Sequence, residues 1–130
     1  MNAVLVNAIY VGLGGFAGSV LRYLAGVVVA GCGLWQPLAT FAVNALGALM
    51  LGAILACGAA GQGGAVARHL LAIGFCGGFT TFSTFSAEVL QLLRAQQHAG
   101  AIAYAAASLA TSVLCVWVGW VLAERFVGRI

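Results

Sequence analysis

Residues 68–94 read RHLLAIGFCGGFTTFSTFSAEVLQLLR, a stretch apolar enough to cross a membrane but interrupted in its middle. Gly74, Gly77 and Gly78 lie near its centre, and each glycine weakens a helix by about 1 kcal/mol relative to alanine. Irregular backbone at membrane depth is tolerated only where it is buried in protein or lines a cavity. We therefore predict a helix break near 75–80, whose freed carbonyl groups suit a cation. The alternative is a continuous helix whose glycines allow close packing.

The whole chain has the composition of a membrane protein. Of its 130 residues, 64% are hydrophobic and 5% charged, whereas a soluble domain has about a quarter of its residues charged. No Asp, Glu, Lys or Arg lies between Arg22 and Arg68 or between Arg94 and Glu124. Since about 20 apolar residues cross a bilayer as a helix, we predict a single all-α membrane domain over 1–130. Its four spans are expected near 4–29, 37–58, 68–94 and 99–123.

Hydroxyl and aromatic side chains alternate after the predicted break. Phe82 and Phe85 are three residues apart, so they share a helix face. The edge of an aromatic ring is electropositive and can meet an anion without a formal charge. Phenylalanines also commonly fill the core of a helical bundle, but the hydroxyls between them, which include Ser83 and Thr84, favour a site for an anion.

Two further spans carry polar residues at membrane depth. Tyr104, Ser108 and Ser112 recur every four residues, so they lie along one helix face. This face is either a polar track that faces protein or water, which usually marks a pathway, or a set of packing hydroxyls. Asn44 lies about a third of the way into the second span. It is expected either to bond a neighbouring helix or to offer a hydrogen-bond donor to a passing solute.

The titratable residues argue against an enzyme. The only carboxylates, Glu88 and Glu124, lie near span ends, and so do both histidines, so no base is expected inside the bundle to activate a nucleophile. The four scattered cysteines form no metal-ligand or disulfide pattern. The basic residues do not cluster, so nucleic acid is not an expected partner. A lining rich in donors and free of buried acid favours a small anion over a cation.

The arginines specify membrane orientation only weakly. Four spans would put Arg68, Arg125 and Arg129 on one side and Arg22 and Arg94 on the other, a split of three to two. Arginines in short loops set the orientation of a membrane protein. A split this nearly even allows the chain to insert both ways and to form an antiparallel dimer. A single orientation with a weak signal is the alternative. Arg22, near the far end of its span, either reaches the headgroups or makes a positive vestibule that attracts anions.

Three motifs together resemble a known family. GGFAGSVLRY at 14–23, TFAVNALGALMLG at 40–52 and GFCGGFTTFSTFSAE at 74–88 resemble the bacterial fluoride channels of the CrcB or Fluc family, and the resemblance covers all four spans. It implies an antiparallel, dual-topology homodimer with two pores, embedded in the lipid of the bacterial inner membrane. It also implies passive export of fluoride from the cytoplasm, which lowers fluoride toxicity.

The same resemblance implies roles for individual residues. The ring edges of Phe82 and Phe85 would meet fluoride, and Arg22 would lie at the vestibule. Backbone carbonyls of Gly77 and Thr80 from both subunits would hold a structural sodium ion at the dimer centre. The implied fluoride pathway comprises Asn44, Phe82, Ser83, Thr84, Phe85, Tyr104, Ser108 and Ser112.

Two rival functions fit the sequence less well. Small multidrug transporters are also short, four-span and dual-topology, but they use a glutamate in the first span, and residues 4–29 contain no acid. A structural membrane subunit without a transport role would have no need of the aligned hydroxyls of the fourth span.

Overall fold

The computed structural model describes residues 2–128, and every regular element within them is a helix. Four helical segments are long and apolar enough to cross a membrane, which confirms the predicted all-α membrane fold. They are α1 (Ala3–Gly31), α2 (Pro37–Ala59), the third span (Gly64–Arg94) and α6 (His98–Val127). The third span consists of α3 (Gly64–Val66), η1 (Ala67–Cys76), α4 (Gly77–Phe79) and α5 (Phe82–Arg94).

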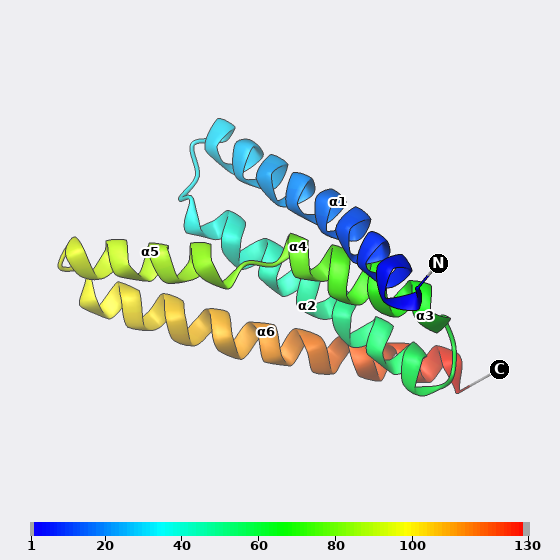
Figure 1. The fold of residues 1–130 in the computed structure, drawn as a ribbon. Coiled ribbons are helices and arrows are strands. Elements are labelled where there is room, and N and C mark those ends of the chain that lie inside the picture. The colour runs from blue at the N-terminus through cyan, green and yellow to red at the C-terminus, as the bar shows by residue number, and fades with distance from the viewer. Residues whose placement is uncertain (1, 129–130) are drawn as a thin grey trace.

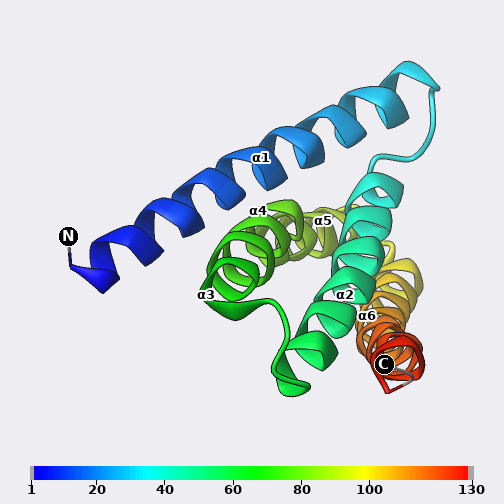
Figure 2. The same cartoon turned by 90° about the vertical axis from the view of Figure 1, so that its right-hand side faces the viewer.

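The helices run up and down, so the start of α1 and the end of α6 lie at the same end of the bundle (Figure 1). The turn between α5 and α6 lies at the opposite end (Figure 1). Viewed from the end that holds the termini, α1 slants across the outside of the bundle, and α2 lies beside α6 (Figure 2). Arg68 is the second residue of η1, near the start of the third span, and so shares an end with Arg125, as predicted. Arg129 lies outside the described residues.

Glycines set how closely the helices approach. A side-chain carbon on Gly14 or Gly18 of α1 would overlap backbone atoms of the third span. Gly52 of α2 and Gly119 of α6 are placed in the same way against the backbone of the other helix. Such close approach is how helices associate in lipid, where burying apolar surface gives little driving force. The bundle is therefore built from two glycine-packed pairs, α1 with the third span and α2 with α6.

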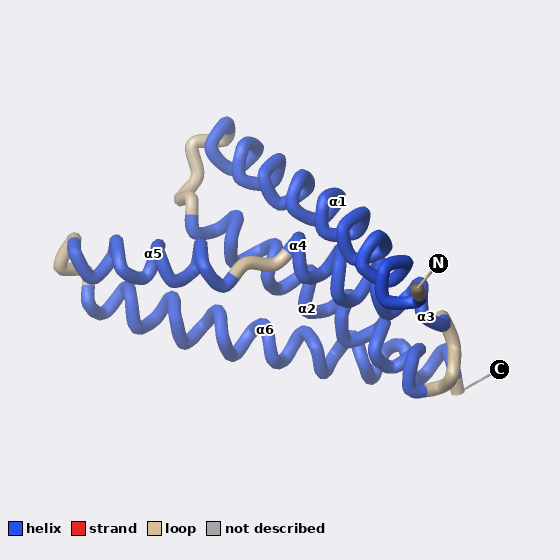
Figure 3. The backbone as a smooth tube through the Cα atoms, viewed as in Figure 1, coloured by secondary structure: helices blue, strands red, loops and turns tan. Residues whose placement is uncertain are grey.

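The predicted break in the third span is confirmed, but it lies at Thr80 and Thr81 and not at the glycines. Both threonines have extended backbone, with φ and ψ of −84° and 158° for Thr80 and of −151° and 120° for Thr81. This segment is the loop between α4 and α5 in Figure 3. Gly77 is helical, with φ −63° and ψ −38°, so the interpretation of Gly77 as an unwound residue is wrong. Gly78 is helical too and lies against the Gly15 carbonyl of α1, so it serves close packing.

The threonines end one helix and begin the next. Thr81 Oγ1 accepts a hydrogen bond from the Thr84 backbone N–H at 3.2 Å, which makes Thr81 the N-cap of α5. The preceding π-helix η1, ten residues long, was not predicted. Such wide turns depend on tertiary packing and have no clear composition signal, although they recur near functional sites.

Replacing Gly18 by alanine should lower the melting temperature of the detergent-purified protein. The added carbon would meet backbone atoms of Phe75 and Phe79, which no rotamer change can move, and overpacking costs about 1–3 kcal/mol. Gly12→Ala is the matched control, since nothing lies within 4 Å of its added carbon and alanine favours a helix. A Gly18→Ala protein that melts no lower than Gly12→Ala would contradict this packing.

Candidate functional site

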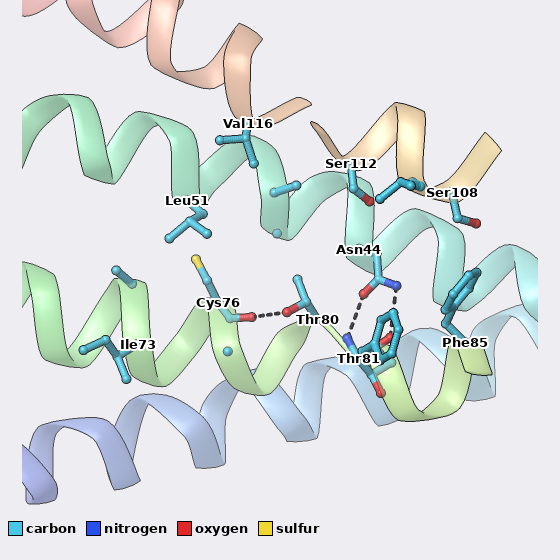
Figure 4. Close-up of a pocket in the computed structure, with 16 residues that line it drawn as sticks. Asn44, Leu51, Ile73, Cys76, Thr80, Thr81, Phe85, Ser108, Ser112 and Val116 are labelled. Atoms are coloured by element: carbon cyan, nitrogen blue, oxygen red, sulfur yellow. Dashed lines mark hydrogen bonds between the residues drawn. The ribbon is translucent and has the colours of Figure 1, made fainter. Parts of the chain in front are cut away.

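One side chain satisfies both backbone groups exposed at the break. The Thr81 N–H donates to Asn44 Oδ1 at 2.7 Å, and Asn44 Nδ2 donates to the Thr81 carbonyl at 3.1 Å (Figure 4). An unpaired backbone group in the membrane costs several kcal/mol, so this pair of bonds makes the break tolerable. Of the two interpretations of Asn44, the structure favours the interhelical bond. Asn44 also lines a pocket, where the second hydrogen on Nδ2 remains to be used.

Other freed backbone groups are bonded by α1 and by the third span itself. Arg22 Nε donates to the Gly78 carbonyl at 3.0 Å, and Ser19 Oγ donates to the same oxygen at 3.5 Å. The backbone N–H and the hydroxyl of Thr80 both donate to the Cys76 carbonyl, at 2.9 and 2.8 Å. Arg22 therefore caps the end of α4, a role that neither sequence interpretation included.

Two carbonyls at the break are left over. In a continuous helix the Gly77 carbonyl would accept from the Thr81 N–H, but Asn44 takes that donor. The Thr80 carbonyl would accept from the Thr84 N–H, which instead donates to Thr81 Oγ1. Within residues 2–128, the hydrogen bonds made outside the regular helices include none to the carbonyl oxygen of Gly77 or of Thr80. Gly77 is exposed, and a side-chain carbon there would meet nothing within 4 Å, so the space beside it is open.

A central pocket of about 450 Å³ lies between α2, the third span and α6. Ser108 is buried, and its Oγ has no hydrogen-bond partner in the described part of the chain, so the wall of the pocket holds an unsatisfied hydroxyl. Figure 4 shows Asn44, Thr80, Phe85, Ser108 and Ser112 around this space. The predicted site residues that line it are Asn44, Gly77, Thr80, Phe82, Phe85, Ser108 and Ser112.

A second, outer pocket of about 370 Å³ lies beyond the break. Arg22 and Glu88 both line it, so it holds charges of both signs. Thr84 lines it as well, and Thr81 lines both pockets. Ser83 lies beside this point, with its Oγ 3.3 Å from Thr81 Oγ1. The extended segment at the break therefore stands between the two pockets.

Sequence reasoning missed Glu88, which it placed near a span end without a role. Thr40 Oγ1 donates to Glu88 Oε1 and the Tyr104 hydroxyl donates to Glu88 Oε2, each at 2.7 Å. Glu88 is half-buried, so the lining predicted to be free of buried acid has a carboxylate bonded to one of its members, Tyr104. Glu88 follows Phe85 by three residues, so a shared helix face was the signal that could have found it.

The two phenylalanines of α5 share a helix face, as predicted, and their rings are in contact. Their ring centroids lie 5.6 Å apart with a tilt of 44°, and the Phe85 ring lies 5.4 Å from the ring of Tyr104. The Phe82 side chain is 80% exposed in the single chain, so one side of the central pocket is open. Phe75 and Phe79 stack on each other before the break.

The residues of the predicted hydroxyl track on α6 face the protein. Tyr104 and Ser108 are buried and Ser112 is half-buried. Ser108 and Ser112 line the central pocket, whereas the Tyr104 hydroxyl is bonded to Glu88. The track is thus divided into a part that opens to a cavity and a part held in a hydrogen-bond network.

These features define a class of protein. Four apolar helices, a break at membrane depth and donor-lined pockets on either side of it are the anatomy of a multi-pass membrane protein that moves a small solute. No group of three metal-ligating side chains occurs within residues 2–128.

Comparison with known proteins names the family. The family model described as "CrcB-like protein, Camphor Resistance (CrcB)" matches residues 9–120, so the chain belongs to this family.

Three similar relatives share nearly the full length of the chain. A protein of Chlorobaculum tepidum is 46% identical over 123 residues, which cover 93% of this chain and 97% of the relative. One from Phenylobacterium zucineum is 43% identical over 129 residues, covering 96% and 98%. One from Thermus thermophilus is 41% identical over 119 residues, covering 91% and 95%. Each of the three bears the name "Fluoride-specific ion channel FluC".

Replacing Asn44 by alanine should destabilise the protein by about 2 kcal/mol, because two backbone groups would lose their bonds at depth. The expected result is a lower melting temperature in detergent. Gln36→Ala removes an amide that makes no cap bond at the start of the same helix and should leave melting unchanged. Equal melting of the two variants would show that Thr81 finds other partners.

Proposed function

We propose that this chain is a fluoride-selective channel that passively exports fluoride from the bacterial cytoplasm and so lowers its toxicity. The observation that carries the proposal is the central pocket, where a buried, unpartnered Ser108 hydroxyl and the Asn44 amide lie near the rings of Phe82 and Phe85. The names of the relatives support the choice of ion.

The lining suits a small, strongly hydrated anion. Removing water from such an ion is very costly unless other hydrogen-bond donors replace it. Ser108, Ser112 and Asn44 are such donors in the central pocket, and the edges of phenyl rings add weak positive charge. Neutral donors bind an anion less tightly than a fixed cation would, which lets it leave again.

The outer pocket would serve as the entrance for the anion, and its lining carries one positive and one negative side chain, Arg22 and Glu88. The Arg22 guanidinium attracts an anion into it, while the Glu88 carboxylate is bonded by two donors, Thr40 and Tyr104. Those two bonds spread the negative charge of Glu88, so it repels an entering anion less than a bare carboxylate would. Thr84 lines the outer pocket, and its oxygen accepts from the Thr81 hydroxyl, so its own hydroxyl hydrogen remains for an ion that moves toward the break.

We infer that the chain has no catalytic role. Glu88 is bonded by a threonine and a tyrosine, whereas His69 and His98 lie near the ends of their spans. General-base activation of a nucleophile requires a base within hydrogen-bond reach of it.

Assembly into an antiparallel homodimer would complete the site. The exposed Phe82 ring and the open space beside Gly77 lie at the open side of the central pocket, where a second copy would cover them. A lone chain would present these groups to lipid, which cannot bond the carbonyls. The nearly even distribution of arginines supports insertion in both orientations, and two copies would give two pores.

The unbonded carbonyls of Gly77 and Thr80 fit a structural sodium ion at the dimer centre. Hard cations prefer oxygen ligands, and here two carbonyls from each subunit are free of competing hydrogen bonds. When bound, the ion supplies positive charge that favours an anion nearby. The surrounding residues hold the two carbonyls in place, through Asn44 on Thr81 and Arg22 on Gly78.

Liposomes loaded with fluoride and reconstituted with the protein should release fluoride, measured with an electrode, and should not release chloride. Phe82→Ile and Phe85→Ile keep apolar bulk but remove the ring edges, and each should slow efflux by about tenfold, the scale of one aromatic contact. Phe126→Ile is the control, because Phe126 is 72% exposed near the end of α6. Equal flux of chloride, or no fluoride flux, would refute the channel.

Protein purified throughout in potassium should melt at a lower temperature than protein in equal sodium, because an ion that binds only the folded dimer stabilises it. Unfolding and refolding each sample in its own salt, followed by a second melt, removes any ion trapped during purification. Identical melting curves in the two salts after refolding would argue against the sodium site.

A further inference from the structure

An exposed tryptophan outside the spans begins a series of rings that ends in the central pocket. The Trp35 ring meets the Tyr104 ring edge to face, with centroids 5.5 Å apart and planes at 70°. Tyr104 contacts Phe85 at 5.4 Å, and Phe85 contacts Phe82 at 5.6 Å. Since Phe85 and Phe82 line the central pocket, the loop between α1 and α2 is connected to it through packed rings.

The backbone of Trp35 is tied on both sides, which sets the direction in which its side chain leaves the chain. Gly33, with φ of 66°, ends α1, and Leu34 N–H donates back to the Val29 carbonyl at 3.1 Å, which is a Schellman end. The Trp35 carbonyl accepts from the Leu38 N–H at 3.0 Å in the first turn of α2. Trp35 therefore belongs to a short connection tied to two helix ends.

Tyr104 is held from several directions, and Trp35 is one of them. Its hydroxyl donates to Glu88 at 2.7 Å and lies 3.4 Å from the Pro37 carbonyl. One neighbouring ring is that of Phe85 and another is that of Trp35. Edge-to-face pairs have a preferred geometry beyond simple burial, so removing the indole should let Tyr104 occupy further rotamers and free Phe85 to follow.

We propose that Trp35 is a positioning residue that holds Tyr104, and through it Phe85, in the orientation the fluoride pathway requires. The inference rests on the proposed function for its flux readout. Trp35 is 55% exposed, so the competing role is an anchor at the membrane interface. An anchor would act independently of Tyr104, and this difference separates the two roles.

The first test compares fluoride efflux from liposomes for three variants. Trp35→Leu keeps apolar volume but loses the ring and should slow efflux about two- to tenfold, the range that one aromatic pair supports. Trp35→Phe restores a ring edge and should recover most of the flux. Trp117→Leu removes a tryptophan that is 62% exposed on α6 and should conduct like the wild type. Unchanged flux in Trp35→Leu, or no recovery in Trp35→Phe, would overturn the proposal.

The second test asks whether Trp35 acts through Tyr104. In a Tyr104→Leu background, the further change Trp35→Leu should have no additional effect on flux, because the contact is already lost. An equal loss in both backgrounds would favour the anchor and overturn the positioning role.

A third readout needs no flux. The chain has three tyrosines, so fluorotyrosine labelling gives few ¹⁹F signals, and Tyr104→Phe assigns the relevant one. The chemical shift of that signal should change in Trp35→Leu and remain the same in Trp117→Leu. An unchanged chemical shift in both variants would refute the contact between Trp35 and Tyr104. If the wild type carries no fluoride, the proposed function fails, while this measurement still decides whether Trp35 holds Tyr104.

Discussion

The two hydrogen bonds between the Asn44 amide and the Thr81 peptide are the interaction on which the rest of the site depends. At membrane depth water is not available to the backbone, so a helix can open only where protein groups replace its internal bonds. Asn44 supplies a donor and an acceptor at once, and Arg22 accounts for the Gly78 carbonyl. Because these bonds occupy the N–H of Thr81, the Gly77 carbonyl is left free.

Close glycine contacts make that interaction geometrically possible. Gly18 lets α1 approach the third span, and Gly52 with Gly119 lets α2 approach α6. Gly47 of α2 faces Thr80, which brings Asn44, less than one turn away, to the level of the break. The central pocket lies between the two glycine-packed pairs of helices, so the glycine contacts that position the helices also determine where the pocket lies.

Glu88 shows that the polar residues of the bundle are not all free hydrogen-bond donors. The Tyr104 hydroxyl, predicted to lie on a track of free hydroxyls, donates to this carboxylate, whereas the Ser108 hydroxyl is unpartnered. Residues with the same side-chain chemistry on one helix face thus serve two purposes. Tyr104 joins a network that connects α2, α5 and α6, and Ser108 leaves an unsatisfied hydroxyl beside the central pocket.

The sequence by itself determined the number of spans, their approximate limits, the presence of a break in the third and the family, because these follow from apolar runs, glycine spacing and a distinctive motif. It also identified the hydroxyl and amide side chains that line the central pocket, apart from that of Thr81. Only the tertiary structure decided that the break lies at Thr80 and Thr81, that Arg22 caps α4 and that Glu88 holds Tyr104. The physical reason is that glycine serves equally well for close packing and for unwinding. Which of the two it does, and which side chain meets a freed peptide group, depends on neighbours tens of residues away.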